Sequence, residues 1–222
     1  MITLRNNNKI AAVIPFFNER STINQIVQST LNHVNTVVAI DDGSTDNSSE
    51  NINLLENVIL LKNDTNQGKG FALRRGLNYA VEKGFDKVIT LDADLQHNPD
   101  EIPLLYSKLD EYPIVVGNRL KNLKGMPLHR RMSNKLTSYL LTIKTGQKIL
   151  DSQSGFRAYR ADVIKNVITT NNGYEAESEI LINASRKGYR IGFADISTIY
   201  GNEMSKMNSV TSTIGFIKLL FS

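Results

Sequence analysis

Short, unbroken apolar runs alternate with segments of helical periodicity along the first half of the chain. The apolar runs predict strands at 9–17, 35–46, 57–63, 86–94 and 113–119. The segments between them predict helices at 22–34, 70–84 and 98–112. Because a strand without polar alternation is covered on both faces, the pattern predicts an α/β fold. Its central sheet would be mostly parallel, with helices on both faces.

The alternation weakens in the second half of the chain. A helix is expected at 128–146 and a late strand at 188–197, whereas 151–159, "DSQSGFRAY", has an irregular pattern. The sequence shows neither an internal repeat nor a linker-like stretch. We therefore expect a single domain over residues 1–222.

The composition excludes several classes of protein. The 222 residues include no cysteine, so disulfides and thiolate metal sites are excluded and a reducing compartment fits. A net charge of +4 and a pI near 9.2 mildly favour anionic partners, although a slightly basic soluble protein has the same values. No apolar run approaches the roughly 20 residues that cross a bilayer, and the start, "MITLRNNNKI", lacks a signal-peptide core.

Two carboxylates stand where the expected strand 86–94 ends, although ionised groups are costly to bury without a partner. Asp92, Asp94 and Gln96 alternate with apolar residues, so an extended backbone would turn all three side chains to one side. Three oxygen-bearing side chains suit a hard divalent cation, Mg²⁺ or Mn²⁺. The competing interpretation is that Asp92 caps the next turn and Asp94 is exposed, which is the commoner meaning of an isolated D-x-D.

Polar clusters also follow other expected strands, whose carboxyl ends should meet at one edge of the sheet. In "AIDDGSTD", Gly43 allows a tight turn and residues 44–46 can cap a helix, or an acid there can bind a base or ribose. "VIPFFNE" places Glu19 after a strand. "NQGKG", with Gly68 and Gly70, is either a phosphate cradle or an ordinary turn into a helix.

Taken together and in this order, these motifs resemble the family-2 glycosyltransferases, which have the GT-A (nucleotide-diphospho-sugar transferase) fold. The resemblance covers most of the chain and rests on "IPFFNE", "DDGSTD", "NQGKG", "DADLQH", "GNR", "DSQSGFRAY" and "SKM". Within the family the chain is most similar to the dolichyl-phosphate mannosyltransferase and polyprenyl-phosphate glycosyltransferase branch. The resemblance implies an inverting, metal-dependent transfer of sugar from GDP-mannose or a UDP-sugar to a polyprenyl or dolichyl phosphate.

The resemblance also implies a division of the chain and a set of site residues. Residues 1–120 would bind the nucleotide sugar, 121–205 would form the acceptor side, and 206–222 would form a C-terminal loop and amphipathic tail. Asp94 and Arg119 would be catalytic, with Arg119 near the phosphates. The metal would be held by Asp92, Asp94 and Gln96. The donor would be bound by Pro15, Phe17, Glu19, Asp42, Asp92, Ala93, Asp94, Gln96 and Lys206.

One position departs from the family pattern. Relatives often have an arginine several residues before the lysine of "SKM", where this chain has Tyr200. One phosphate contact is therefore missing or supplied from elsewhere, which bears on the identity of the donor.

The nature of the acceptor determines whether a catalytic base is needed. A polyprenyl phosphate is already largely ionised at pH 7, because a phosphomonoester has a second pKa of about 6. Positioning and charge stabilisation then suffice. An alcohol acceptor would need a carboxylate base, and Glu175, Glu177 and Glu179 are available. We favour the other interpretation of these three acids, a solvated helix start.

Lipid contacts are expected in two segments. Arg130, Arg131 and Ser133 lie in or beside a basic cluster in 121–135 that would bind the acceptor phosphate and a membrane surface, although a solvated helix face has the same composition. In the tail, one helical face is apolar and either packs on the protein or lies in the membrane interface. That face is formed by Val210, Ile214, Ile217 and Phe221.

Other interpretations remain open at this stage. The same fold would also serve transfer to a glycan or small alcohol, or a nucleotide-sugar-binding protein without turnover. His97 and His129 could ligate a metal, although lone histidines are more often structural or exposed. We expect a cytoplasmic protein, peripheral at the cytoplasmic membrane face, that binds no nucleic acid, with a membrane protein as a further candidate partner.

Overall fold

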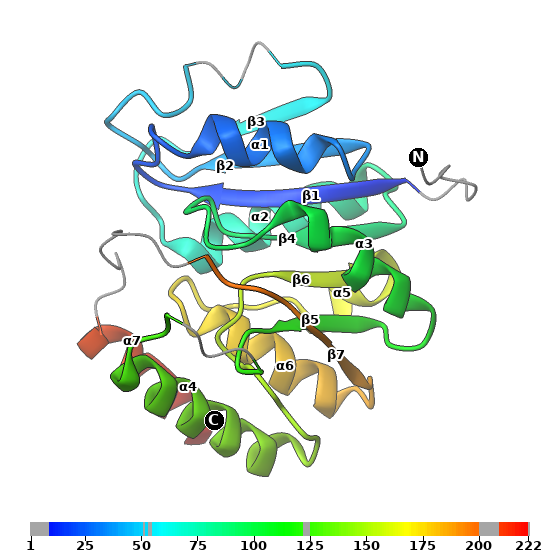
Figure 1. The fold of residues 1–222 in the computed structure, drawn as a ribbon, viewed down its shortest axis with the longest axis vertical. Helices are drawn as coiled ribbons and strands as arrows, with labels where there is room; N and C mark the ends of the chain where they lie inside the picture. The colour runs from blue at the N-terminus through cyan, green and yellow to red at the C-terminus, as the bar shows by residue number, and fades with distance from the viewer. Residues whose placement is uncertain (1–8, 51, 53–54, 122–124, 200–208, 222) are drawn as a thin grey trace.

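A seven-stranded sheet in the order β3-β2-β1-β4-β6-β5-β7 forms the centre of the computed structural model (Figure 1). The structure describes residues 9–50, 52, 55–121, 125–199 and 209–221. Among the paired strands described, β6 is antiparallel to β4 and β5, and the other pairs are parallel. The strands are β1 (Ile10–Phe16), β2 (Thr36–Asp41), β3 (Val58–Lys62), β4 (Lys87–Thr90), β5 (Ile114–Asn118), β6 (Arg157–Arg160) and β7 (Ile191–Asp195).

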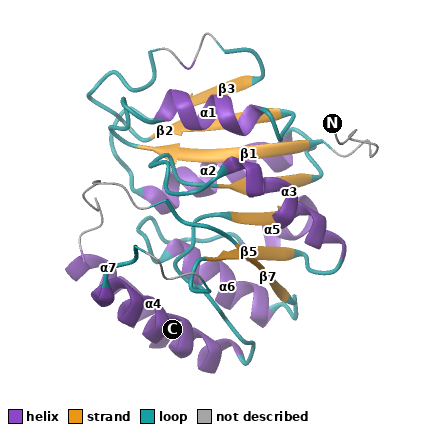
Figure 2. Ribbon diagram, in the orientation of Figure 1, coloured by secondary structure: helices purple, strands orange, loops and turns teal. Residues whose placement is uncertain are grey.

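Helices cover both faces of this sheet, as the sequence predicts (Figure 2). One core contains Ala11 and Val13 of β1 with α2, α4, α5, α6 and α7, and the other contains Ile10, Ala12 and Ile14 with α1 and α3. All seven residues of β1 are buried, which explains why its sequence is an unbroken apolar run. The helices are α1 (Ile23–Leu31), α2 (Lys69–Glu82), α3 (Ile102–Tyr106), α4 (Leu128–Thr145), α5 (Ala161–Val167), α6 (Ala176–Arg186) and α7 (Ser209–Phe221).

The strand register shapes the edge of the sheet where β1 and β2 end. Phe16 of β1 pairs with Asp41 of β2, whereas the last residue of β4, Thr90, pairs with Val13. β4 therefore stops pairing three residues before β1 does. The chain after Thr90 is released from the sheet beside the ends of β1 and β2.

Three expected elements differ from the structure. The strand expected at 86–94 ends at Thr90. The helix expected at 98–112 is α3 flanked by 3-10 turns at Pro99–Glu101 and Ser107–Asp110. Pro103 accounts for the break before α3, because proline lacks the N–H that a continuous helix needs. The segment 151–159, expected to be irregular, contributes β6 between β4 and β5.

The tail forms α7, which packs on the body of the protein with a different face from the one expected. Leu219 is buried, and Lys144 Nζ of α4 donates a hydrogen bond to the Leu220 carbonyl at 2.9 Å. Ile217 and Phe221, which belong to the expected apolar face, are exposed. The side chains of Val210 and Ile214 lie outside the described residues.

Candidate active site

The predicted polar clusters meet at the edge where β1, β2, β4 and β5 end (Figure 1). The Asn18 N–H donates to Ser44 Oγ and the Glu19 N–H donates to Ser48 Oγ, each at 2.9 Å. These bonds fix the turn after β1, which follows Pro15 and contains Phe17, against the turn after β2. Thr22 Oγ1 donates to the Glu19 carboxylate at 3.1 Å, so this acid also stabilises the start of α1.

Asp42 is buried and holds the loop that leads into α2. Its carboxylate accepts hydrogen bonds from Asn63 Nδ2 at 2.7 Å, from the Gln67 N–H at 3.0 Å and from the Gly68 N–H at 2.8 Å. Gly68 has a φ of 99°, a conformation that L side chains rarely adopt. Asp42 therefore shapes the "NQGKG" loop, and its role toward a base or ribose stays a prediction.

Lys69, the first residue of α2, joins two carboxylates from distant parts of the chain. Its Nζ lies 2.7 Å from Asp92 Oδ1, after β4, and 2.9 Å from Glu177 Oε1 in α6. Burial alone would lower the pKa of Lys69, but the two carboxylates outweigh it and raise the pKa well above its usual value. Lys69 is therefore a fixed positive charge at the sheet edge.

Asp92 is held ionised by its neighbours. Burial opposes the charged form, but Lys69 outweighs it, with His97 contributing, so the pKa of Asp92 lies well below its ordinary value. His97 is 2 % exposed, with its Nε2 3.8 Å from Asp92 Oδ2 and its ring 5.2 Å from that of Phe156. His97 thus supports Asp92 from the core. Gly155 also packs against Asp92, where a Cβ would lie 2.6 Å from Asp92 Oδ2.

Asp94 lies near Asp92 but not in the extended backbone expected from the sequence. The chain bends over residues 92–96, with Leu95 at a φ of 59°, and the Gln96 N–H donates to Asp94 Oδ1 at 3.1 Å. The alternation argument for Asp92, Asp94 and Gln96 is therefore wrong, because strand geometry has ended at Thr90. Burial, followed by the negative charge of Asp92, raises the pKa of Asp94.

The donor set at this edge suits a hard divalent cation with several open positions. Burial and the charge of Asp92 disfavour the ionised form of the Asp94 carboxylate, and a cation there would offset the repulsion from Asp92. Asp92 already contacts Lys69, so Asp94 is the better ligand. In the part of the chain that the structure describes, no three His, Asp or Glu side chains converge into a cage, so substrate phosphates and water would complete the coordination.

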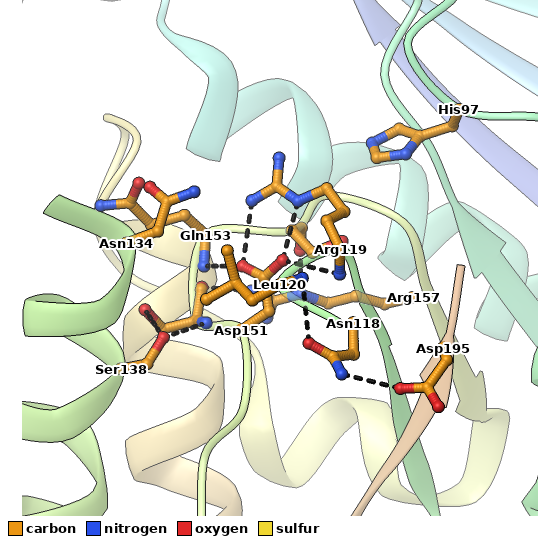
Figure 3. Close-up of polar contacts among 12 residues, drawn as sticks. His97, Asn118, Arg119, Leu120, Asn134, Ser138, Asp151, Gln153, Arg157 and Asp195 are labelled. Carbon is orange, nitrogen blue, oxygen red and sulfur yellow. Dashed lines mark hydrogen bonds and ion pairs between the residues drawn. The ribbon is translucent and has the colours of Figure 1, made fainter. Parts of the chain in front are cut away.

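Arg119, which follows β5 and is partly buried, forms an ion pair with the buried carboxylate of Asp151 (Figure 3). Arg119 Nε and its backbone N–H donate to Asp151 Oδ2 at 2.8 and 3.1 Å, and NH2 donates to Oδ1 at 3.0 Å. Burial opposes the charge of Asp151, but the guanidinium outweighs it and lowers the pKa of that carboxyl. The pair fixes the direction of Arg119, whose predicted contact with donor phosphates stays a prediction.

Arg157 is fully buried, and its guanidinium donates hydrogen bonds to backbone carbonyl oxygens. It donates to the carbonyls of Ser154 at 2.7 Å, Glu177 at 2.7 Å and Ser152 at 3.0 Å. Arg157 therefore ties the loop before β6 to the start of α6. Because Gly155 of this loop contacts Asp92, Arg157 holds in place the loop that packs against the Asp92 carboxylate.

The acids of α6 are not a solvated helix start, so that sequence interpretation is wrong for two of them. Glu177 and Glu179 are buried, Glu177 against Lys69. The Glu179 carboxylate accepts hydrogen bonds from the backbone N–H groups of Thr170 at 3.0 Å and Asn171 at 3.1 Å. Burial opposes this charge, but these bonds and those from neighbouring side chains lower the pKa of Glu179.

The remaining predicted site residues lie on α4 or outside the described residues. Arg130, Arg131 and Ser133 lie in the first turns of α4, where Arg131 Nε donates to the Met126 carbonyl at 2.7 Å. Ala93 is buried at the edge, between the two aspartates. Lys206, like Tyr200, lies outside the described residues.

Sequence reasoning missed Lys69, Asp151 and Arg157 as site residues. Each stands inside a motif that the sequence singles out, "NQGKG" or "DSQSGFRAY". A charged residue next to the glycines, or beside a buried aromatic residue, was the available signal. Their partners are far away in sequence, so only the fold identifies them.

The arrangement of sheet and helices is that of a GT-A glycosyltransferase. A structure of glucosyl-3-phosphoglycerate synthase from Mycobacterium tuberculosis, in complex with Mn²⁺, UDP and phosphoglyceric acid, superposes with a TM-score of 0.76. The match covers 97% of this chain and 78% of that one at 20% sequence identity.

The chain belongs to glycosyl transferase family 2, whose profile matches residues 11–168, and it is a glycosyltransferase. UDP-N-acetylglucosamine–dolichyl-phosphate N-acetylglucosaminyltransferase of Methanococcus voltae is 34% identical over 93% of this chain and 92% of that protein. Undecaprenyl-phosphate 4-deoxy-4-formamido-L-arabinose transferase of Proteus mirabilis is 35% identical over 74% of this chain and 52% of that protein. This chain therefore aligns with about half of the Proteus protein.

Proposed function

We propose that this glycosyltransferase moves a sugar from a nucleotide-diphosphate sugar to a polyprenyl phosphate, with Mg²⁺ or Mn²⁺ and with inversion at the anomeric carbon. The names of the Methanococcus and Proteus relatives support a polyprenyl-phosphate acceptor. The Methanococcus name and the UDP complex of the Mycobacterium protein favour a UDP-sugar over GDP-mannose as donor.

The observation that carries this proposal is the position of Asp94 beside Asp92 at the carboxyl edge of the sheet. Asp92 is held ionised by Lys69, and its charge and the surrounding protein disfavour a second carboxylate at Asp94. Asp94 would hold a divalent ion, which would offset the charge of this carboxylate and supply stabilisation of the negative charge on the departing nucleoside diphosphate. Gln96 would remain near this ion through the same turn.

The side chains of this chain would orient the donor rather than exchange protons with it. Lys69 fixes Asp92, and Asp151 fixes Arg119 as a directed positive charge for the phosphates. Pro15, Phe17 and Glu19 lie along the same edge, where a nucleotide base would extend. With donor and acceptor held in line, displacement from the face opposite the leaving group inverts the anomeric carbon.

A phosphate acceptor agrees with the environment of Glu177, which is the best-placed candidate for a catalytic base. Its Oε1 already contacts Lys69 Nζ at 2.9 Å. An alcohol acceptor would need a carboxylate free to take a proton. A lipid phosphate is ionised at neutral pH and needs none.

The lipid acceptor would bring the enzyme to a membrane. None of the helices in the described part of the chain has the length and apolar character needed to span a bilayer. We expect peripheral attachment at the cytoplasmic membrane face, directly or through a membrane partner protein.

Transfer to a polyprenyl phosphate tests this function directly. Labelled UDP-N-acetylglucosamine, other UDP-sugars and GDP-mannose would be offered with Mn²⁺, Mg²⁺ or EDTA, and the matched acceptor would be the polyprenol without its phosphate. We expect metal-dependent product with the phosphate and none with the alcohol. Product with a soluble alcohol that is lost in Glu177→Gln would contradict the proposal.

A further inference from the structure

One face of α4 exposes five large apolar side chains. They are Leu128, Met132, Leu136, Tyr139 and Ile143, each between 58% and 70% exposed. Successive residues of a helix lie about 100° apart, so these five fall within an arc of about 80°. Scattered surface hydrophobics are ordinary, but a continuous stripe along an 18-residue helix is not. We call it the α4 stripe.

The surroundings of the α4 stripe carry positive charge. The helix contains Arg130, Arg131, Lys135 and Lys144 and no acidic residue. Exposed Lys135 adjoins one side of the stripe on the helical wheel, and His129 adjoins the other. α7, which packs against α4, adds exposed Lys218 and Phe221 and also lacks acidic residues. An apolar stripe on a helix whose only charged side chains are basic complements an anionic lipid surface.

The opposite face of α4 is built into the catalytic half of the molecule. Asn134, Ser138 and Leu141 are buried there. The Ser152 N–H donates to Ser138 Oγ at 3.0 Å, and the neighbouring Asp151 holds Arg119. The α4 stripe therefore faces outward from a helix whose inner face supports the active site, and α4 lies at the rim of the molecule in Figure 1.

We propose that the α4 stripe docks the enzyme on an anionic bilayer, with the helix parallel to the surface and its apolar side chains in the headgroup region. This inference rests on the proposed lipid acceptor, because docking through α4 places the sheet edge near the headgroups where a polyprenyl phosphate lies. It assigns the main membrane contact to the apolar face of α4, whereas the sequence pointed to the basic cluster in 121–135 and to the tail.

A second copy of the chain is a poorer occupant of the stripe. A two-fold interface brings the same patch from both copies together. Because the rim of the stripe is cationic, such a dimer would set Lys135 of one copy near the like charges of the other. Anionic headgroups, by contrast, would attract these basic side chains.

Vesicle co-sedimentation of the full chain tests the docking. The vesicles contain either phosphatidylcholine alone or a mixture in which about one third of the lipid is phosphatidylglycerol. The variants are Leu136→Glu, Leu136→Trp and, as a matched control on α3, Leu104→Glu. We expect binding to the anionic vesicles that falls at least about tenfold in Leu136→Glu, strengthens in Leu136→Trp and is unchanged in Leu104→Glu.

Equal binding by Leu136→Glu and the wild type overturns the inference, as does a wild-type protein that does not bind anionic vesicles. Dimerisation that depends on Leu136, without vesicle binding, also overturns it. Melting temperatures of the variants confirm that each is folded.

A comparison of two acceptor formats separates this inference from the proposed function. Leu136→Glu should keep its transfer to polyprenyl phosphate dispersed in detergent and lose transfer to the same lipid in vesicles. If the wild type transfers to neither format but its vesicle binding depends on Leu136, the docking stands and the proposed acceptor fails. If Leu136→Glu uses both formats as well as the wild type does, the docking is wrong and the acceptor stands.

Discussion

The ammonium of Lys69 lies 2.7 Å from Asp92 Oδ1 and links the end of β4 to α6 through Glu177. Lys69 therefore joins residues 1–120, which the sequence predicts to bind the donor, to residues 121–205, which it predicts to form the acceptor side. A change at Lys69 should affect both sides at once.

Replacing Lys69 tests this coupling. Lys69→Met leaves two partly buried carboxylates without their counter-charge, which should cost about 1–3 kcal/mol of stability. Misplacement of Asp92 should also lower kcat by about 100-fold. Lys69→Arg keeps the charge and should retain more of both. Steady-state kinetics and urea unfolding of the two variants measure these effects, and unchanged kcat in Lys69→Met would exclude the positioning role.

Asp94 should be required for activity but not for stability. The pKa of Asp94 is raised by burial and by the charge of Asp92, so the folded protein disfavours the ionised form. A raised carboxyl pKa in the folded state means that this group destabilises the fold as pH rises through the unfolded value of about 3.9. Asp94→Asn removes that charge.

We expect Asp94→Asn to lose metal-dependent turnover and, without added metal at pH 7, to unfold at the same or a higher urea concentration than the wild type. Glu82→Gln, which removes one exposed charge at the end of α2, is the control for net charge. An active Asp94→Asn protein, or one that is much less stable, would remove the metal assignment.

The sequence predicts the sheet and its edge well because both depend on local patterns. β1 and β5 are buried throughout, so their apolar runs are continuous. The sequence did not predict β6 as a strand, because it is four residues long and contains two arginines, one of them buried against carbonyl oxygens. A buried arginine looks like a surface residue until its partners are known.

The sequence predicts the ion pairs of the site poorly. Glu177 looked solvated because three acids stand together at the start of α6, but packing against α2 brings it to Lys69. The two aspartates of the D-x-D motif lie at the edge of the sheet, but the extended backbone assumed for them is wrong, because β4 ends before them. Contacts between distant segments depend on tertiary structure, which periodicity does not encode.

The ion pair between partly buried Arg119 and fully buried Asp151 should stabilise the fold at neutral pH. The pKa of Asp151 is lowered, because the attraction of Arg119 outweighs the cost of burial. A lowered carboxyl pKa contributes stability above its unfolded value of about 3.9, and this contribution is lost as pH falls through the folded value. Asp151→Asn removes the buried carboxylate charge that Arg119 contacts, so we expect a loss of about 3 kcal/mol at pH 7.

Urea unfolding at several pH values measures that loss, which should shrink as the pH falls below about 4. Asp162→Asn is the matched control, because the pair of Arg160 and Asp162 is exposed and should matter little. A loss for Asp151→Asn that is independent of pH would show that the carboxylate charge is not the cause.

Gly155 should be intolerant of even one added methyl group, because of its contact with the catalytic edge. A Cβ at this position would lie 2.6 Å from Asp92 Oδ2, so Gly155→Ala must displace the Asp92 carboxylate or the loop that Arg157 holds. We expect about 1–3 kcal/mol of lost stability and a fall in kcat of about 100-fold.

Gly84→Ala provides the comparison. Nothing lies within 4 Å of a Cβ at position 84, but the φ of Gly84 is 72°, so the substitution strains the backbone far from the site. Gly84→Ala should therefore lower the melting temperature and leave the turnover of the folded enzyme intact. If both variants lose stability but neither loses turnover, the position of Asp92 does not limit the reaction.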